Sequence, residues 1–507
     1  MLKRSRIALA SMAAATAAVL FCGTASAAPG IGAPGIGDPY YPGDGNGGYD
    51  VSHYDIRINY TPGADRLAGT TTILATATQD LTQFNLDFLL KVTSVRVNND
   101  IARSTSKRGE LVVKPAKEIR AGDQLTIVVS YDDVPGKYEL YHYNAWKTTP
   151  TGVLAVDEPQ ISPWWYPSNN HPTDKATFDV SVAVPQGLEV ISNGVLVGTQ
   201  QQINGWVRWN WHSAKPQDTY ATFFAVEQYD VRNSTAPNGQ PVVNAYAEDL
   251  VYADAARASV ERTPEIIEFE ETVFGPYPFE AQGGVVTTAL GFALENQTRP
   301  VYDDRFFRRG SNTYVVAHEL AHQWYGDSVS VNRWKDIWLN EGFATYAEYL
   351  WSEHLGEGTA AEVAQFAYDD RPAEDPFWQV IVADPTPAGQ FDDAVYERGG
   401  MTLQALRTAV GDARFFRILK TWATGKRYGD ASTADFIAHA EQVSGQQLDE
   451  LFRIWLYTPG KPAVGPNGTV SAAAGARVAS ATAVAPKSFA EIRATQRDLV
   501  ATDRTRG

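Results

Sequence analysis

The chain has 507 residues, of which 44% are hydrophobic and 11% aromatic, and its formal net charge is −16. This length predicts two or three domains, and the composition is that of packed globular domains rather than of a disordered chain. A surface for nucleic acid needs a basic stripe, so the negative charge argues against a nucleic-acid partner.

The N-terminus has the pattern of a secretory signal peptide over residues 1–27. Basic residues at three of the first six positions precede an apolar run, and Ala25-Ser26-Ala27 forms a typical cleavage site. We therefore expect cleavage after Ala27 and a secreted protein. Cleavage would remove Cys22, the only cysteine, so no disulfide is expected. No later apolar stretch is long enough to cross a bilayer.

Residues 28–48 are rich in glycine and proline and are predicted to be a spacer. Over residues 49–232, short runs alternate apolar and polar positions between turns, as in HYDIRINY, QLTIVVSY and ATFDVSVAV. This period of two predicts an N-terminal antiparallel β domain. The turn-rich stretch NSTAPNGQP at 233–241 marks its predicted end.

Helical spacing follows this boundary, first over residues 251–272 and then over long segments from about 311 to 457. A β domain followed by a mainly helical domain, here at 233–462, gives an α+β fold class. Residues 463–507 form an Ala/Thr-rich stretch without apolar periodicity, and a flexible tail is predicted there.

The strongest chemical signal is His318-Glu319-x-x-His322 in the stretch VAHELAHQWYGD. On a helix, histidines at positions i and i+4 share one face and can bind one cation. Glu319 lies about 100° further round the helix, where a carboxylate can act as a general base on a water molecule beside the metal. A helix whose histidines belong to the core is the alternative interpretation.

The next motif argues against that alternative. Glu341, in the stretch WLNEGFATY, lies on a second helix predicted to begin near Asn340, with eighteen residues between Glu341 and His322. Two imidazoles and one carboxylate with a fourth position open are the donor set of catalytic zinc. We therefore expect one Zn²⁺ per chain, bound by His318, His322 and Glu341. The other histidines show no ligand spacing and are interpreted as structural or exposed: His53, His142, His171, His212, His354 and His439.

The two motifs, in the settings HELAHQWYGD and WLNEGFATY, resemble those of the aminopeptidase N family of gluzincin zinc metallopeptidases. GFALENQTRP (291–300) resembles the exopeptidase loop of that family, and VYERGGMTLQAL (395–406) resembles the helix start that carries its catalytic tyrosine. The resemblance covers roughly residues 49–462. It implies a saddle-shaped or sandwich-like N-terminal β domain before a thermolysin-like, mainly helical catalytic domain.

The resemblance is to a short, secreted bacterial type without the large C-terminal helical domain of longer relatives. That domain normally closes over the site, so the resemblance implies a cleft that is more open to solvent.

The resemblance also implies roles for residues that spacing alone would not select. Tyr396 would stabilise the oxyanion of the tetrahedral intermediate, and Glu295 would bind the protonated α-amine of a peptide. Asn296 would contact the substrate backbone or shape the loop. Glu158 is a further candidate for a polar group facing the amine. Asp327 would either orient a zinc-binding histidine or lie on the surface.

The predicted function is a secreted zinc aminopeptidase that hydrolyses the N-terminal bond of peptides with a free N-terminus. Two alternatives stay open: a thermolysin-like endopeptidase, which would also cleave N-acetylated peptides, and a non-catalytic secreted zinc-binding protein. Glu319 argues against the second, because a structural zinc site fills four ligand positions and needs no general base.

Overall fold

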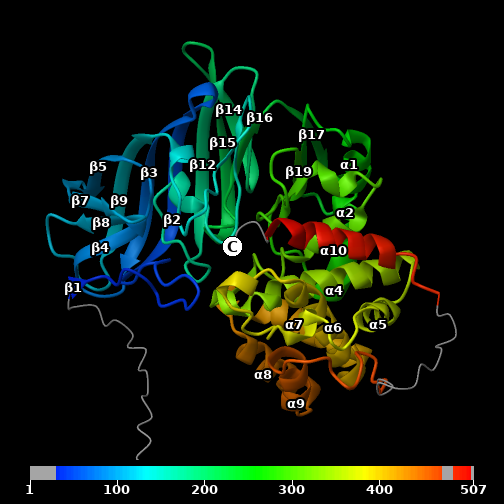
Figure 1. Cartoon of the computed structure of the whole chain (residues 1–507). Coiled ribbons are helices and arrows are strands. Elements are labelled where there is room, and N and C mark those ends of the chain that lie inside the picture. The colour runs from blue at the N-terminus through cyan, green and yellow to red at the C-terminus, as the bar shows by residue number, and fades with distance from the viewer. Residues whose placement is uncertain (1–29, 471–483, 504–507) are drawn as a thin grey trace, which may run out of the picture.

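The computed structural model describes residues 30–470 and 484–503, so the predicted signal peptide lies outside the described residues. A domain of β-strands comes first and a mainly helical domain follows it (Figure 1). The predicted α+β fold class is therefore confirmed.

The β domain contains three sheets. Its strands are β1 (Gly30–Ile31), β2 (Tyr49–Thr61), β3 (Arg66–Ala77), β4 (Leu81–Asp87), β5 (Val92–Val97), β6 (Asp100–Ile101), β7 (Arg103–Lys107), β8 (Glu110–Lys114), β9 (Gln124–Asp133), β10 (Lys147–Thr148), β11 (Val153–Ala155), β12 (Ala176–Pro185), β13 (Glu189–Ser192), β14 (Val195–Gln202), β15 (Trp206–Gln217) and β16 (Phe224–Glu227). The largest sheet has the order β14-β15-β12-β2-β3-β9-β5-β6. Two four-stranded sheets, β1-β4-β8-β7 and β10-β11-β16-β13, complete the domain.

The alternating sequence of β2 explains its place in the large sheet. Tyr54, Ile56 and Ile58 point into the core, and the residues between them are more exposed. β2 pairs antiparallel with β3 but parallel with β12, where Ile56 lies opposite Val180. A parallel pair needs a long connection, which the chain between the two strands supplies. The predicted antiparallel arrangement is therefore correct except at this pair and at the parallel pair of β1 and β4.

The prediction of a spacer at 28–48 is wrong for its described residues. β1 pairs with β4, and the buried Asp38 accepts a hydrogen bond from the backbone N–H of Trp334 in the helical domain (2.9 Å). The Tyr41 hydroxyl donates to Gln390 (2.8 Å), also in the helical domain. Polar contacts thus fix this segment against both domains. Such contacts require no apolar periodicity, so no sign of them is seen in the sequence.

The second domain begins with a five-stranded sheet rather than with a helix. Its strands are β17 (Tyr229–Thr235), β18 (Pro241–Ala247), β19 (Gln282–Thr287), β20 (Ala293–Leu294) and β21 (Val301–Asp303), in the order β17-β18-β19-β21-β20. The turn-rich stretch at 233–241 holds the end of β17 and the turn of the hairpin that β17 forms with β18. The boundary predicted at 232/233 therefore falls inside β17, and the chain passes between the domains just before this strand.

The helices of the second domain follow the predicted helical segments. They are α1 (Ala253–Val260), α2 (Thr263–Phe274), α3 (Thr313–Ala321), α4 (Trp338–Leu355), α5 (Ala360–Asp370), α6 (Asp393–Val410), α7 (Asp412–Gly425), α8 (Thr433–Ser444) and α9 (Asp449–Phe452). A small parallel sheet of β22 (Val329–Val331) and β23 (Gly429–Ala431) lies among them. One large apolar core joins α1 to α4 with α6, α7 and α8.

α4 and α6 cross in close contact at a pair of glycines. A Cβ atom added to Gly399 would lie 2.8 Å from the Cα atom of Gly342, and one added to Gly342 would lie 2.9 Å from the Cα atom of Gly399. Only glycine allows backbones to approach so closely. The crossing brings Glu341, which precedes Gly342, towards Tyr396, one turn before Gly399.

The prediction of a flexible tail at 463–507 is wrong for its last helix, α10 (Phe489–Asp503). This helix, red in Figure 1, contacts α3 and α6. Ile492, Leu499 and Val500 are buried. They share one helix face, but alanine and charged residues surround them and obscure the periodicity.

Within residues 30–470 and 484–503, no helix has both the length and the apolar character that a membrane span requires.

Candidate functional site

α3 carries the two histidines of the sequence motif. The helix begins after Asn312, whose side-chain oxygen accepts hydrogen bonds from the backbone N–H groups of Tyr314 and Val315 (3.1 and 3.3 Å). His318 lies in the last full turn, and His322 follows the helix as its C-terminal cap. Their ring centroids are 5.0 Å apart, on the same side of the helix.

Glu341, in the first turn of α4, reaches both histidines. Its Oε2 atom lies 3.2 Å from His318 Nε2 and 3.4 Å from His322 Nε2. Ligand atoms about 2.0–2.1 Å from one tetrahedral ion lie about 3.3–3.4 Å apart, so the spacing fits zinc. The three side chains each offer a donor atom, and these atoms all lie within 4.8 Å of one another. The predicted ligand set therefore comes together in the structure.

Each histidine is oriented through its other ring nitrogen. His318 Nδ1 donates to Glu348 Oε1 (2.8 Å), and His322 Nδ1 donates to the backbone oxygen of Tyr325 (3.1 Å). These bonds leave Nε2 of both rings for a metal. Sequence reasoning missed Glu348, although a signal was present. It follows Glu341 by seven residues, two turns along the same helix face.

Asp327 does not orient a histidine, so that prediction is wrong. It is fully buried, not on the surface, and neither carboxylate oxygen has a hydrogen-bond partner among the described residues. Burial raises the pKa of Asp327 well above its ordinary value. The backbone oxygen of Tyr325, not Asp327, accepts the hydrogen bond from His322 Nδ1.

The metal-binding residues stabilise one another's charged forms. Burial lowers the pKa of His318, but Glu341 and Glu348 raise it, and the net result is a pKa of about 9, so a metal ion binds His318 in exchange for a proton. Burial raises the pKa of Glu341, but His322 and His318 outweigh it and lower the pKa to about 2. Glu341 is therefore an ionised carboxylate, the form that binds a metal ion.

Glu319 lies beside the same ligands. Burial raises the pKa of Glu319 to about 8, against the opposing effect of the two histidines. A carboxyl group with a pKa near neutrality can both accept and return a proton. A carboxylate oxygen of Glu319 lies within 4.8 Å of donor atoms from His322 and Glu295. The predicted general base and the predicted amine anchor are thus neighbours.

Glu295 follows β20 and is fixed from two directions. The Tyr220 hydroxyl, from the β domain, donates to Glu295 Oε1 (3.0 Å). The side chain of Gln323, directly after the second histidine, donates to the backbone oxygen of Glu295 (3.0 Å). Sequence reasoning missed both Tyr220 and Gln323. Only the position of Gln323 next to the motif could have indicated it.

Asn296 points away from the site. Its amide donates to the backbone oxygen of Ala221 (3.3 Å), and it does not line the cavity described below. The neighbouring Arg299 is also buried and donates to the backbone oxygens of Val243 and Gly194 (both 3.1 Å). Asn296 therefore shapes the loop rather than facing a substrate, because its amide is used to join the loop to the β domain.

Tyr396, in the first turn of α6, stacks on His318 with ring centroids 6.0 Å apart and an interplanar angle of 19°. Glu158 reaches the same cavity from the β domain. It also borders a second cavity of about 120 Å³, which is lined by Tyr41, Tyr141 and Phe391 among others.

The cavity over the metal-binding residues is small, about 20 Å³. The three metal-binding residues, Glu295, Glu319 and Tyr396 are each at most 4% exposed. The expectation of an open cleft is therefore wrong in this structure, because α10 contributes Leu499 to the wall. The cavity is lined by Glu158, Phe292, Ala293, Leu294, Glu295, His318, Glu319, His322, Glu341, Tyr396 and Leu499.

The remaining histidines are not part of a metal site in the described part of the chain. His171 lies 3.3 Å from the Asp38 carboxylate, and His212 lies 2.7 Å from that of Asp179. These contacts agree with the structural role predicted for them.

Two domain matches cover well over half of the chain. Residues 51–221 match the peptidase M1 N-terminal domain, and residues 259–455 match the peptidase family M1 domain. The chain belongs to peptidase family M1. The resemblance found in the sequence motifs is therefore confirmed.

Solved structures of M1 enzymes are similar to this M1 chain over nearly their full length. A mutant of a two-domain M1 zinc metallopeptidase bound to L-arginine shares 26% identity with a TM-score of 0.77, covering 86% of this chain and 100% of that one. A mutant M1 zinc metallopeptidase from Deinococcus radiodurans, bound to a Tyr-Ser-Ala substrate, shares 27% identity with a TM-score of 0.75 (84% and 99% covered). These matches confirm the two-domain fold and the zinc cofactor.

Curated relatives are longer. Glutamyl aminopeptidase of Rattus norvegicus is 25% identical over 462 residues, which cover 82% of this chain and 48% of that protein. The chain spans about half or less of the length of the curated relatives it matches.

Proposed function

We propose that this M1 chain is a secreted zinc aminopeptidase that removes the N-terminal residue of peptides with a free amine. The observation that carries the proposal is the place of Glu295, whose carboxylate lies within 4.8 Å of donor atoms of Glu319 and His322 in a buried cavity. A group that can hold the end of a peptide therefore lies beside the groups that attack its first bond. The names of the curated relatives and the peptide-bound M1 structure support a peptide substrate.

The protonated α-amine of a peptide would pair with Glu295. Tyr220 holds one oxygen of this carboxylate (3.0 Å), and the buried surroundings make a charge-assisted hydrogen bond strong. An acetylated N-terminus or an internal segment has no charge to offer, so it would leave a buried carboxylate unpaired. This preference separates an aminopeptidase from a thermolysin-like endopeptidase.

Proton transfer would be the task of Glu319. Zinc held by His318, His322 and Glu341 would supply Lewis-acid polarisation of the carbonyl group and of the attacking water. Glu319 accepts one proton as the water oxygen bonds to the carbonyl carbon, and returns it to the departing nitrogen as the C–N bond breaks. The net reaction adds one water across the peptide bond.

Tyr396 would stabilise the negative charge that develops on the carbonyl oxygen. Its ring stacks on His318 and lines the same cavity, so the side chain is positioned at the site before the reaction begins. A donor that is positioned in advance stabilises a transition state without a cost of reorganisation.

Paired substrates test the proposal. An aminoacyl p-nitroanilide and its N-acetylated form are compared with and without a chelator. We expect turnover of the free amine only, loss with chelator and recovery with added zinc. Glu319→Gln should keep its zinc and lose about 10²–10⁴-fold in kcat. Equal turnover of both substrates would favour the endopeptidase, and no turnover with zinc bound would favour the non-catalytic protein.

Secretion is the second part of the proposal, and the signal-peptide pattern of residues 1–27 supports it. N-terminal sequencing of the mature protein should begin at Ala28, in the culture medium. Recovery of the uncleaved chain inside the cell would contradict it.

A further inference from the structure

The last helix of the described chain reaches the metal centre. α10 lies against α3 and α6, and its Leu499 lines the cavity together with Glu295, Glu319 and Tyr396. Leu499 itself is 5% exposed. A segment remote in sequence from both catalytic motifs therefore forms part of the wall around the reacting groups.

The cavity cannot hold a substrate as it stands. Its volume of about 20 Å³ is enough for about one water molecule. A peptide bond with its flanking residues needs several times this space. Part of the wall must therefore move before a peptide reaches Glu295 and Glu319.

Most of the wall is held by the fold itself. The metal-binding residues lie on α3 and α4 in the main core, and the loop that ends in Glu295 is fixed by the pairing of β20 with β21 and by Arg299. α10 differs, because it is the last helix of the described chain, belongs to no sheet and carries no metal ligand; it contributes Leu499 to the wall. Its departure would break no strand pairing in the described chain, but it would expose Ile492, Leu499 and Val500 of the main core.

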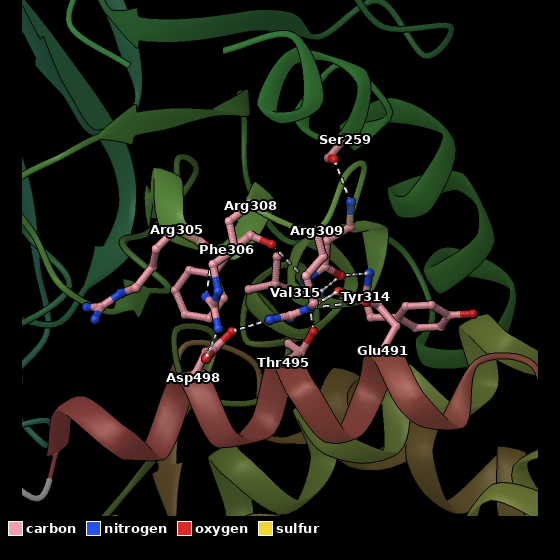
Figure 2. Close-up of polar contacts among 11 residues, drawn as sticks. Ser259, Arg305, Phe306, Arg308, Arg309, Tyr314, Val315, Glu491, Thr495 and Asp498 are labelled. Carbon is pink, nitrogen blue, oxygen red and sulfur yellow. Dashed lines mark hydrogen bonds and ion pairs between the residues drawn. The ribbon is translucent and has the colours of Figure 1, made fainter. Parts of the chain in front are cut away.

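The polar face of α10 is held mainly by ion pairs. Figure 2 shows Asp498 and Glu491 directed at the segment before α3. Asp498 lies 2.7 Å from Arg308 and 3.0 Å from Arg309, and Glu491 lies 3.1 Å from Arg309. These side chains are partly exposed, so each pair contributes little and is weakened by salt. The polar side of the docking is therefore weak, and the buried Ile492, Leu499 and Val500 supply the rest of the contact.

Two further contacts couple α10 to the catalytic helices. The Thr495 hydroxyl accepts a hydrogen bond from the side chain of Asn312, the N-terminal cap of α3 (2.9 Å). Thr495 is labelled in Figure 2. Arg493 pairs with Glu397, which directly follows Tyr396. The position of the helix is thus linked to the elements that carry the histidines and the tyrosine.

We propose that α10 is an autoinhibitory lid, in which Leu499 fills the place of a bound peptide and the docked form is inactive. This inference rests on the proposed aminopeptidase function, since the lid controls the access of peptides to that site. A peptide and Leu499 compete for the same cavity, and activity requires α10 to leave.

The test uses three variants of the full-length zinc protein. Leu499→Ala shortens the side chain that occupies the cavity while the helix stays docked. The double variant Glu491→Arg with Asp498→Arg places arginines against Arg308 and Arg309 and loosens the helix. Arg497→Ala is the matched control, because Arg497 is exposed on the same helix. The readouts are the rate of zinc extraction by a chelator and kcat/KM for a free-amine tripeptide.

We expect both rates to rise in the first two variants and to stay at wild-type values in the control. If the lid is closed in nine molecules of ten, full opening raises the apparent affinity about tenfold. Wild-type values for both readouts in both variants would overturn the proposal. Faster zinc extraction with reduced turnover would also overturn it, because α10 would then be a support. Zinc extraction could be faster in the first two variants while neither the wild type nor any variant hydrolyses the tripeptide. That result would support the lid and reject the aminopeptidase function.

Discussion

Each zinc-site histidine depends on a second residue for its orientation. Glu348 fixes His318 through a 2.8 Å bond, and the backbone of Tyr325 fixes His322 through a 3.1 Å bond. A carboxylate partner also makes an imidazole a stronger ligand. Glu348 therefore contributes to metal affinity without touching the metal.

Glu348→Ala should weaken zinc binding about 10–100-fold, since His318 loses its orienting partner. Glu348→Gln should recover part of the loss, because its amide oxygen can still accept the hydrogen bond. Competition with a chromophoric chelator measures both affinities. Wild-type affinity in the alanine variant would show that His318 does not need this partner.

For single residues, local spacing in the sequence predicted the metal-binding motif, but contacts between residues remote in sequence could not be predicted. His318, Glu319 and His322 are neighbours on one helix, so the sequence places them directly. Tyr220 and Glu295 are 75 positions apart in the sequence, and no local pattern predicts the contact between them. The prediction for Asp327 failed because closeness in sequence did not mean contact. It is close to His322 in sequence, but its side chain points elsewhere.

The crossing of α4 and α6 is the element-scale feature on which the site depends most. It joins the helix of Glu341 to the helix of Tyr396 through Gly342 and Gly399. A side chain at either glycine would have to push the helices apart, and densely packed cores resist this.

Gly399→Ala should therefore destabilise the protein by about 1–3 kcal/mol through overpacking and should lower kcat by displacing Tyr396. Urea unfolding measures the first effect and turnover the second. Gly425→Ala is the control, because an added Cβ there meets nothing within 4 Å. An alanine at position 399 that is as well tolerated as one at 425 would contradict the account of the crossing.

The segment before β2 offers a test by pH. Burial raises the pKa of Asp44 to about 7 from an ordinary value of 3.8, although hydrogen bonds from Gln160 and Tyr141 oppose the shift. The folded state therefore binds a proton that the unfolded state releases between about pH 4 and pH 7. The contribution of this group to stability is present at low pH and is lost as pH rises through that window.

Asp44→Asn should make the free energy of unfolding less dependent on pH between about 4 and 7, because the titrating group is gone. Urea unfolding of both proteins across this range gives the two slopes. Identical slopes would show that Asp44 is not a buried acid of this kind.

Elements with their own periodicity were predicted well from sequence, and elements held by distant partners were not. β2 and α3 show clear alternation or helical spacing. The segment at 30–48 and α10 do not, because Asp38 and Leu499 are buried by chain that lies far away in sequence. Composition rich in glycine, proline or alanine therefore indicates weak local preference, and it does not by itself indicate disorder.

At the scale of the whole molecule, both domains build the site. Glu158 and Tyr220 come from the β domain, and the zinc ligands come from the helical domain. The apolar core of the β domain also includes Val243 and Val285 from the five-stranded sheet of the second domain. The contact between domains therefore places Tyr220 of the β domain against Glu295 of the second domain.

The most direct measurement is the position of zinc in crystals of the purified protein, found by anomalous scattering at the zinc edge. We expect one peak per chain, in contact with Nε2 of His318, Nε2 of His322 and a carboxylate oxygen of Glu341, and with no fourth protein ligand. A peak elsewhere, or a fourth side chain on the metal, would contradict the catalytic site described above.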